Sequence, residues 1–211
     1  MAENALLLID LQNDFCAHGA LAVPGGDEVV PIANALMSRF SLVVATADAH
    51  PPTHLSFASN HAGKVAYDQM ELDGLPQVLW PDHCVAGTPG AAFHPLLDQA
   101  GIHHVVAKGT DPRIDSYSGF FDNGHRKQTE LDAYLKSQGV QTVYVMGLAT
   151  DYCVKWSALD ALTLGYRVLL VQDGCRGVGL VPTDIGEALR AIHRAGAHFV
   201  TSAEVLSATY P

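Results

Sequence analysis

Six short apolar segments recur along this chain of 211 residues, and most of the stretches between them have the 3.6-residue period of helices. The apolar segments are residues 5–9, 42–47, 104–107, 142–147, 167–172 and 198–203. Strands that are apolar along their whole length are typical of a parallel sheet with both faces covered. The sequence therefore predicts an α/β protein with three layers, in which helices cover both faces of a mostly parallel six-stranded sheet.

Two of the helical stretches have recognisable boundary residues. In each of them a threonine and an aspartate favour the start of a helix, and a glycine favours its end. These residues are Thr129, Asp132 and Gly139 for the first helix, and Thr183, Asp184 and Gly196 for the second. Both helices lie between apolar segments, which supports the predicted alternation.

Residues 49–103 depart from this alternation. The stretch is rich in Pro, Gly and His, and we expect only one short helix in it, at residues 91–99. Loops of such length are usually functional. With 48% hydrophobic residues the chain is long enough to bury one sizeable core. We therefore expect a single domain, residues 1–211, that contains this long loop region.

Charge and composition exclude several classes of partner. The net charge of -10 and the pI near 5.4 argue against nucleic acid, because binding to phosphates depends on Lys and Arg. The first apolar run ends at Asp10 and is too short for a signal peptide or a membrane span. We expect a cytoplasmic protein with four reduced cysteines. The sequence leaves open whether the chain forms a homo-oligomer.

Residues with reactive or charged side chains follow most of the predicted strands. In open α/β sheets, ligands bind beyond the carboxyl ends of the strands. The residues expected at this edge are Asp10, Asp48, His50, Lys108, Cys153 and Asp173. A carboxylate, an Asp-x-His pair, a lysine and a cysteine at one edge are a more specific signal of a reactive site than any of them alone.

Cys153 is predicted to lie in the first turn of a helix that Thr150 caps. Backbone N–H groups and the positive end of the helix dipole would stabilise a thiolate there, which favours a nucleophile. The same turn could receive an oxyanion, with the N–H groups of Ala149 and Cys153 as candidate donors. The alternative is a small buried cysteine with no chemical role, which this segment alone makes about equally probable. That alternative is preferred for Cys16, Cys84 and Cys175.

Asp10 and Lys108 are expected to lie beside this thiol. An ionised carboxylate at the end of a buried strand needs a partner, and Lys108 is a natural one. A carboxylate beside a thiol and an ammonium group can accept the thiol proton and later donate it to a leaving amine. A purely structural ion pair is the alternative, and the presence of Cys153 favours catalysis over it.

The motif "DAHPPTH" and the motif "WPDHC" suggest a metal site in the long loop region. They bring one carboxylate and several imidazoles together, from Asp48, His50, His54 and His83. A mixed N/O set with open positions suits Zn²⁺ or Fe²⁺ in a functional site. The remaining histidines have no spacing that requires a metal.

Several long motifs resemble the nicotinamidase branch of the isochorismatase-like cysteine hydrolases. The segments that carry the resemblance are "LLLIDLQNDFC", "HPPTHLSFASNH", "LDGLPQVLWPDHCVAGTPGA", "KGTDPRIDSYSGFFDNG", "VMGLATDYCVKWSALDAL" and "LGYRVLLVQDGCRGV". Together they span nearly the whole chain. The resemblance implies a Rossmann-like isochorismatase fold and a deamidase that converts nicotinamide to nicotinate and ammonia in NAD salvage. It also implies activity on pyrazinamide.

The resemblance assigns roles to individual residues. It implies Asp10 as proton shuttle, Lys108 as the third member of a triad with it, Cys153 as nucleophile, and a cis peptide bond before Ala149 at the oxyanion hole. It implies one divalent metal ion, zinc before iron or manganese, on Asp48, His50 and His83, with His54 either a variant ligand or outside the ligand set. Phe15, Trp80 and Tyr117 match aromatic positions that enclose the pyridine ring.

One position departs from the family pattern, and two rival functions follow from the same residues. Ala49 stands where the family commonly has an aromatic residue beside the metal loop. The first rival is a sister cysteine hydrolase acting on another small amide, a carbamoyl or a ureido compound. The second is a metal-binding protein without catalysis, which the set of Asp10, Lys108 and Cys153 argues against.

Overall fold

The computed structural model describes residues 2–208 and contains the predicted sheet. The six strands are β1 (Asn4–Ile9), β2 (Val43–Asp48), β5 (His104–Lys108), β6 (Thr142–Leu148), β7 (Arg167–Arg176) and β8 (His198–Val200). They pair in the order β5-β2-β1-β6-β7-β8, and every pairing in this sheet is parallel. The predicted three-layer α/β fold is confirmed.

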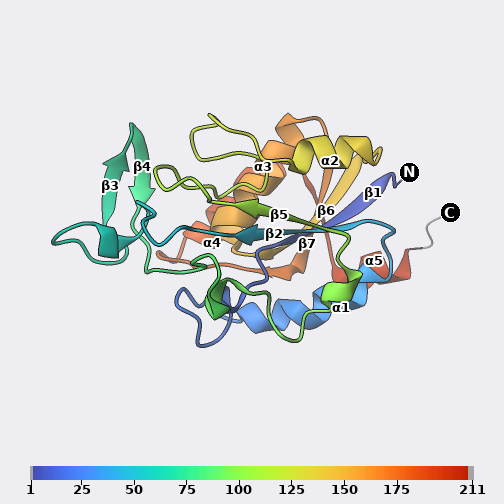
Figure 1. The fold of residues 1–211 in the computed structure, drawn as a ribbon. Helices are drawn as coiled ribbons and strands as arrows, with labels where there is room; N and C mark the ends of the chain where they lie inside the picture. Colours follow the sequence, from blue (N-terminus) through green and yellow to red (C-terminus); the bar gives the residue numbers. More distant parts are fainter. Residues whose placement is uncertain (1, 209–211) are drawn as a thin grey trace.

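Within residues 2–208, five α-helices cover the two faces of the sheet. They are α1 (Val29–Met37), α2 (Leu131–Ser137), α3 (Lys155–Thr163), α4 (Asp184–Arg194) and α5 (Ser202–Ser207). Figure 1 shows α1 and α5 on one face of the sheet and α2 and α3 on the other. The central strand β1 is buried between these layers, and its residues Leu6, Leu7 and Leu8 have no exposed surface. None of the described helices is long and apolar enough to cross a membrane.

The chain changes direction along the sheet between β1 and β6. From β1 it passes through α1 to β2 and β5 on one side, and it then returns to β6 on the other side of β1. Such a point is where open α/β sheets bind ligands, beyond the carboxyl ends of the strands. The ends of β1, β2, β5 and β6 are therefore neighbours at this edge.

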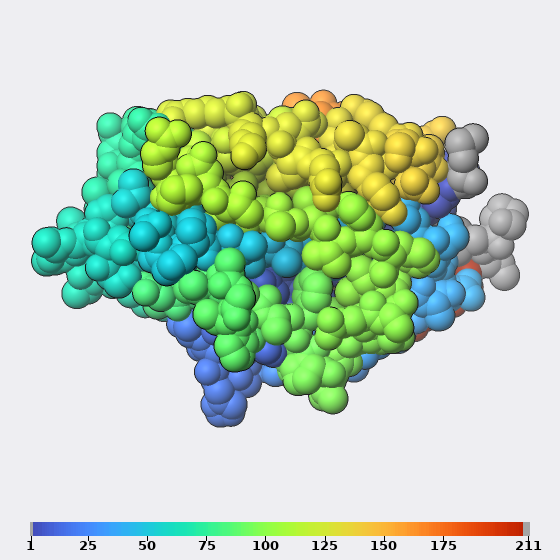
Figure 2. All heavy atoms as spheres, viewed as in Figure 1, coloured from blue at the N-terminus to red at the C-terminus, as the bar shows by residue number. Residues whose placement is uncertain are grey.

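The long segment 49–103 differs from the prediction. No α-helix forms at residues 91–99, where the structure has only the 3₁₀ turns Pro89–Ala91 and Gln99–Gly101. An unpredicted antiparallel hairpin forms instead from β3 (Gln69–Leu72) and β4 (Leu75–Val78). Figure 1 shows this hairpin beyond the end of the sheet to which β2 points. In the space-filling view, residues between β2 and β6 (cyan to yellow) cover most of the face shown (Figure 2).

The helix boundaries agree only in part with the prediction. Gly139 and Gly196 follow α2 and α4 with positive φ angles of 80° and 110°. The Thr129 hydroxyl accepts the N–H of Leu131, the first residue of α2, at 3.2 Å, whereas Thr183 does not cap α4 through its side chain. The last apolar segment is a strand only to Val200, because Thr201 and Glu204 form a capping box that opens α5.

Candidate active site and metal site

Asp10, Lys108 and Cys153 come together at the carboxyl edge of the sheet. Asp10 follows β1 directly, Lys108 is the last residue of β5, and Cys153 lies in the turn after β6. All three are buried, with exposed fractions of 0%, 2% and 6%. A carboxylate, an ammonium group and a thiol therefore share one enclosed site.

Lys108 is the hub of this group. Its Nζ lies 2.9 Å from Oδ2 of Asp10 and donates to Sγ of Cys153 at 3.4 Å. It also donates to Oδ1 of Asp48 at 2.6 Å and to the Ser116 carbonyl at 2.9 Å. The sequence predicted the contact with Asp10 but not the one with Asp48. The ammonium group thus links the thiol and its neighbouring carboxylate to the aspartate of the predicted metal site.

Burial and charge set the protonation of the three groups. Burial raises the pKa of Asp10, and the Lys108 ammonium offsets only part of this effect. Burial also raises the pKa of the Cys153 thiol well above its usual value, against the lowering by Lys108. Burial alone would lower the pKa of Lys108, but the carboxylates of Asp10 and Asp48 outweigh it and raise that pKa. Cys153 is therefore a thiol at rest and needs a base, and Asp10 accepts a proton more readily than an ordinary aspartate.

The turn that holds Cys153 differs from the prediction. Residues Thr150–Val154 form a π-helical turn before α3, and Thr150 does not cap a helix. Cys153 therefore does not lie at the start of an α-helix, and burial raises the pKa of its thiol rather than lowering it. The Leu148–Ala149 peptide bond is cis, as the family resemblance implied. Ala149 lines the same cavity as Cys153.

Asp48, His50 and His83 form a buried group with the chemistry of a metal site. One potential ligand atom from each lies within 4.8 Å of the others. Nδ1 of His50 is 2.9 Å from the Gly109 carbonyl, and Nδ1 of His83 is 2.8 Å from the Pro81 carbonyl. A carbonyl only accepts, so each ring carries its proton on Nδ1 and leaves the Nε2 lone pair for an ion. These residues fit a divalent metal.

The pKa shifts of His50 and His83 also agree with a metal site at this group. Burial alone would lower the pKa of His50, but the Asp48 carboxylate outweighs it and raises the pKa to about 9. Burial, followed by the charge of His50, lowers the pKa of His83 to about 4. Without an ion, a proton on His50 balances Asp48. A metal cation at the same place would supply this positive charge instead.

His54 lies next to this group but is arranged differently. Its Nδ1 accepts the backbone N–H of Ser56 at 3.1 Å, which puts the ring proton on Nε2. Nε2 is buried and has no hydrogen-bond partner among residues 2–208. One potential ligand atom from each of His54, His50 and Asp115 lies within 4.8 Å of the others. In this tautomer His54 would offer an N–H donor next to His50 and Asp115.

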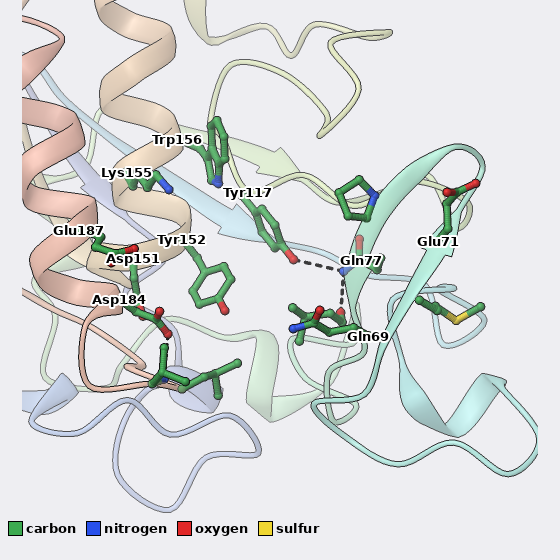
Figure 3. Close-up of a pocket in the computed structure, with 15 residues that line it drawn as sticks. Gln69, Glu71, Gln77, Tyr117, Asp151, Tyr152, Lys155, Trp156, Asp184 and Glu187 are labelled. Carbon is green, nitrogen blue, oxygen red and sulfur yellow. Dashed lines mark hydrogen bonds between the residues drawn. The ribbon is translucent and has the colours of Figure 1, made fainter.

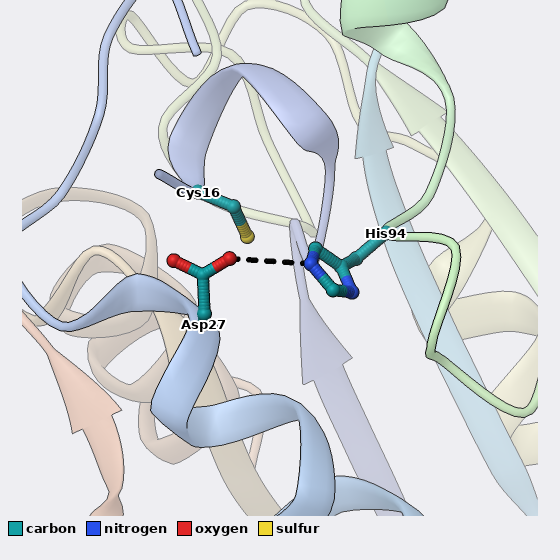
Figure 4. A group of neighbouring side chains, drawn as sticks. All are labelled: Cys16, Asp27 and His94. Atoms are coloured by element: carbon teal, nitrogen blue, oxygen red, sulfur yellow. Dashed lines mark ion pairs between the residues drawn. The ribbon is translucent and has the colours of Figure 1, made fainter. Parts of the chain in front are cut away.

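A second group with potential ligand atoms consists of Cys16, Asp27 and His94 (Figure 4). His94 Nδ1 accepts the N–H of Leu96, so Nε2 carries the proton and points it at Oδ1 of Asp27, 3.2 Å away. Burial raises the pKa of Cys16 to about 11, so it stays a thiol. The group is satisfied internally, which agrees with the packing role expected for Cys16.

A small cavity adjoins the thiol and contains all three predicted aromatic residues. Phe15, Trp80 and Tyr117 line it together with Cys153, Ala149, Asp48 and His83. The structure adds four lining residues that the sequence reasoning missed, namely Leu21, Asp115, Tyr152 and Val178. Tyr152 could have been found from its place beside Cys153. Leu21, Asp115 and Val178 lie in loops, whose sequences have neither the helix nor the strand period.

A wider cavity of about 690 Å³ adjoins this small one, and Tyr117 and Tyr152 line both. Figure 3 shows the two rings with Gln77 of β4, whose side-chain amide donates to the Tyr117 hydroxyl at 3.2 Å. The Trp80 indole N–H donates to the same hydroxyl. The β3–β4 hairpin is thus hydrogen-bonded to Tyr117, which lines the small cavity beside Cys153.

Asp173 does not reach the site. It lies inside β7, and its carboxylate accepts the N–H and the hydroxyl of Ser202 at the start of α5. The prediction that it marks a strand end is wrong, because β7 continues to Arg176. Its role is to fix α5 to the sheet.

Comparison with known proteins agrees with this geometry. The model of the isochorismatase domain family matches residues 4–204. The nicotinamidase of Escherichia coli is 53% identical over 97% of this chain and 97% of its own. The structure of an Acinetobacter baumannii nicotinamidase and pyrazinamidase matches with a TM-score of 0.93 and 41% identity, covering 96% of this chain and 98% of the other. That of a Pyrococcus horikoshii pyrazinamidase in complex with zinc has a TM-score of 0.77 and 37% identity, covering 94% and 99%. The fold, the arrangement at the carboxyl edge and these matches together show that the chain belongs to the isochorismatase domain family.

Proposed function

We propose that this protein hydrolyses nicotinamide to nicotinate and ammonia through a thioester on Cys153. The observation that carries the proposal is the contact of Lys108 Nζ with both Asp10 and Cys153, at 2.9 Å and 3.4 Å. It places a base beside a nucleophile that lines a cavity with aromatic walls. The similarity to the E. coli nicotinamidase along nearly the whole chain supports the same substrate.

The aromatic residues would hold the pyridine ring. Phe15, Trp80 and Tyr117 line the cavity, and the Trp80 and Tyr117 ring centroids are 6.4 Å apart. Flat apolar walls suit a flat heteroaromatic ring, and pyrazinamide has the same shape and a ring nitrogen in the same place. Both amides are therefore expected substrates.

Acylation begins when Asp10 takes the proton of Cys153. The sulfur then attacks the amide carbon, and the backbone N–H groups of Ala149 and Cys153 are our candidates to receive the developing oxyanion. Asp10 next gives its proton to the departing nitrogen as the C–N bond breaks, so ammonia leaves. Lys108 holds the Asp10 carboxylate in place through both steps.

Deacylation uses the same carboxylate in reverse. Asp10, ionised again, removes a proton from water, and the water oxygen attacks the thioester carbon. The C–S bond breaks, nicotinate forms and the Cys153 sulfur regains a proton. The raised pKa of Asp10 suits a group that must both accept and return a proton in one cycle.

We assign Asp48, His50 and His83 as ligands of one divalent ion, and His54 as a donor outside the ligand set. Zinc suits this donor set best, and iron or manganese are alternatives. A bound ion would supply an electrophilic position for the ring nitrogen and so orient the ring. Within the chain, Lys108 donates to Asp48 Oδ1 and helps to hold this carboxylate in place.

The test is ammonia release by the purified protein from nicotinamide and from a panel of carbamoyl and ureido compounds. We expect release from nicotinamide, loss of it in Cys153→Ala, and retention in the matched variants Cys16→Ala and Cys175→Ala. Turnover of a carbamoyl or ureido compound alone would favour the rival hydrolase.

The four free thiols support a reducing compartment such as the cytoplasm.

A further inference from the structure

A third cavity, of about 380 Å³, shares Tyr117 with the small cavity beside Cys153. Tyr117 lines both, and the other walls come from β4, the loop 117–125 and α3. Leu75 and Pro76 form its apolar side, with Trp156 and Asp160 on α3. The volume is in the range of small-molecule sites. No lysine or arginine lines it.

Asp160 lines this cavity and has a carboxylate oxygen without a hydrogen-bond donor among the described residues. The residue is 4% exposed, and its Oδ1 lies 3.1 Å from Nε2 of His125. Oδ2 is buried and has no hydrogen-bond partner among the described residues. A buried carboxylate oxygen without a donor is costly, so it indicates a donor that the chain itself does not provide. Asp122, the second carboxylate of the lining, already accepts backbone N–H groups of Gly124 and Arg126.

Trp156 favours a cation with a flat body. Its ring lines both this cavity and the wider one, whereas Lys155, whose Nζ is 4.8 Å from the indole, lines only the wider one. Trp156 is 40% exposed, so the ring is open to a ligand. Indole faces attract cations and stack on flat groups. The cavity thus offers a carboxylate, an aromatic face and an aliphatic wall.

We propose that this cavity is a second binding site, for a compact organic cation that has an N–H donor and a flat apolar body, such as an arylalkylammonium ion. Its ammonium group pairs with the carboxylate of Asp160, which lines the cavity, and its body lies between Trp156 and the Leu75–Pro76 wall. The site is separate from the thiol and does not depend on the proposed reaction.

Isothermal titration of the full chain with benzylammonium tests this site, with benzyl alcohol as the neutral ligand of the same shape. We expect measurable binding of benzylammonium, and affinity lower by about tenfold to a hundredfold for benzyl alcohol and for Asp160→Asn, as loss of a charge-assisted hydrogen bond predicts. Asp98→Asn, an exposed change of equal charge, should leave the affinity unchanged. Saturating nicotinamide, added to the Cys153→Ala protein, should not displace the cation.

Equal affinity of wild type and Asp160→Asn, equal affinity for the alcohol, or displacement by nicotinamide would each overturn the proposal. So would the absence of binding at millimolar concentrations. If Asp160→Asn does not fold, Trp156→Leu decides, because this side chain is partly exposed and its loss should still weaken binding about tenfold. An unchanged affinity in Trp156→Leu would then contradict the site.

Discussion

Lys108 donates a 2.6 Å hydrogen bond to Asp48, and the same Nζ lies 2.9 Å from Asp10. One ammonium group therefore joins a proposed metal ligand to the proposed catalytic base. Changes to either carboxylate will alter the charge balance around the other. Among the proposed ligands, His83 is the one whose substitution should disturb Lys108 least. Its ring hydrogen-bonds the Pro81 carbonyl, whereas Asp48 bonds Lys108 directly and His50 bonds the carbonyl of the neighbouring Gly109.

Asp10→Asn and Lys108→Ala should each lower kcat by roughly 10²–10⁴-fold, the usual range for a lost acid–base group. The double variant should be little worse than either single one, because the two groups act as a unit. Lys136→Ala, which removes an exposed lysine that pairs with Asp132, is the matched control and should keep kcat. Losses that multiply in the double variant would indicate a structural ion pair instead.

Metal removal should separate binding of the ring from bond breaking. A chelator or His83→Ala should lower kcat/KM for nicotinamide by roughly a factor of 100, the cost of a misplaced substrate, but lower the weak activity on benzamide much less. Benzamide lacks the ring nitrogen that the ion would bind. Alkylation of Cys153 by a small reagent should continue in both forms. Equal kcat/KM for the two amides in the metal-loaded protein would refute the orienting role.

The strand ends could be predicted because their signal is local. Each buried strand is a continuous apolar run, so the polar residue that ends it is visible in the sequence, as with Asp10 and Lys108. The parallel arrangement then places these ends at one edge. Asp173 does not follow this rule because β7 extends past it, through Gly174, Cys175 and Arg176, which do not continue the apolar run.

The contacts made by loops could not be predicted in the same way. β3 and β4 have only four residues each and lack an apolar pattern, and β4 contains a proline. Asp115 lies near His50 and His54 because the loop that carries it, which has no periodic pattern, comes back to these residues. The pKa of Cys153 depends on burial from several elements, which outweighs the local effect of the turn.

Gly147→Ala should destabilise the protein and disturb the approach to Cys153. Gly147 has a φ of +125°, and a Cβ atom there would lie 2.2 Å from the Ile9 carbonyl oxygen. We expect a loss of more than about 2 kcal/mol in the free energy of unfolding. Gly165→Ala, with a φ of +92° but open space around it, should cost about 1 kcal/mol. Urea unfolding of both variants checks this, and equal losses would contradict the clash.

Cys175 should contribute to unfolding at high pH. Burial raises the pKa of this thiol from 9.0 to about 12 in the folded state. Its contribution to stability is therefore complete below pH 9 and is lost as the pH rises towards 12. Cys175→Ser, which keeps a donor for the Val171 carbonyl, should weaken the pH dependence by up to about 1.4 kcal/mol per pH unit. The same pH dependence in both proteins would show that the Cys175 thiol does not drive alkaline unfolding.

The covalent step at Cys153 is tested most directly by mass spectrometry of the protein, quenched in acid during turnover of nicotinamide and then digested. We predict one nicotinoyl group on the peptide that contains Cys153, and none on the peptides of Cys16, Cys84 or Cys175. The adduct should be absent in Cys153→Ala and should disappear when substrate is exhausted. A nicotinoyl group on another cysteine, or rapid turnover with no adduct under conditions that trap thioesters, would contradict the account.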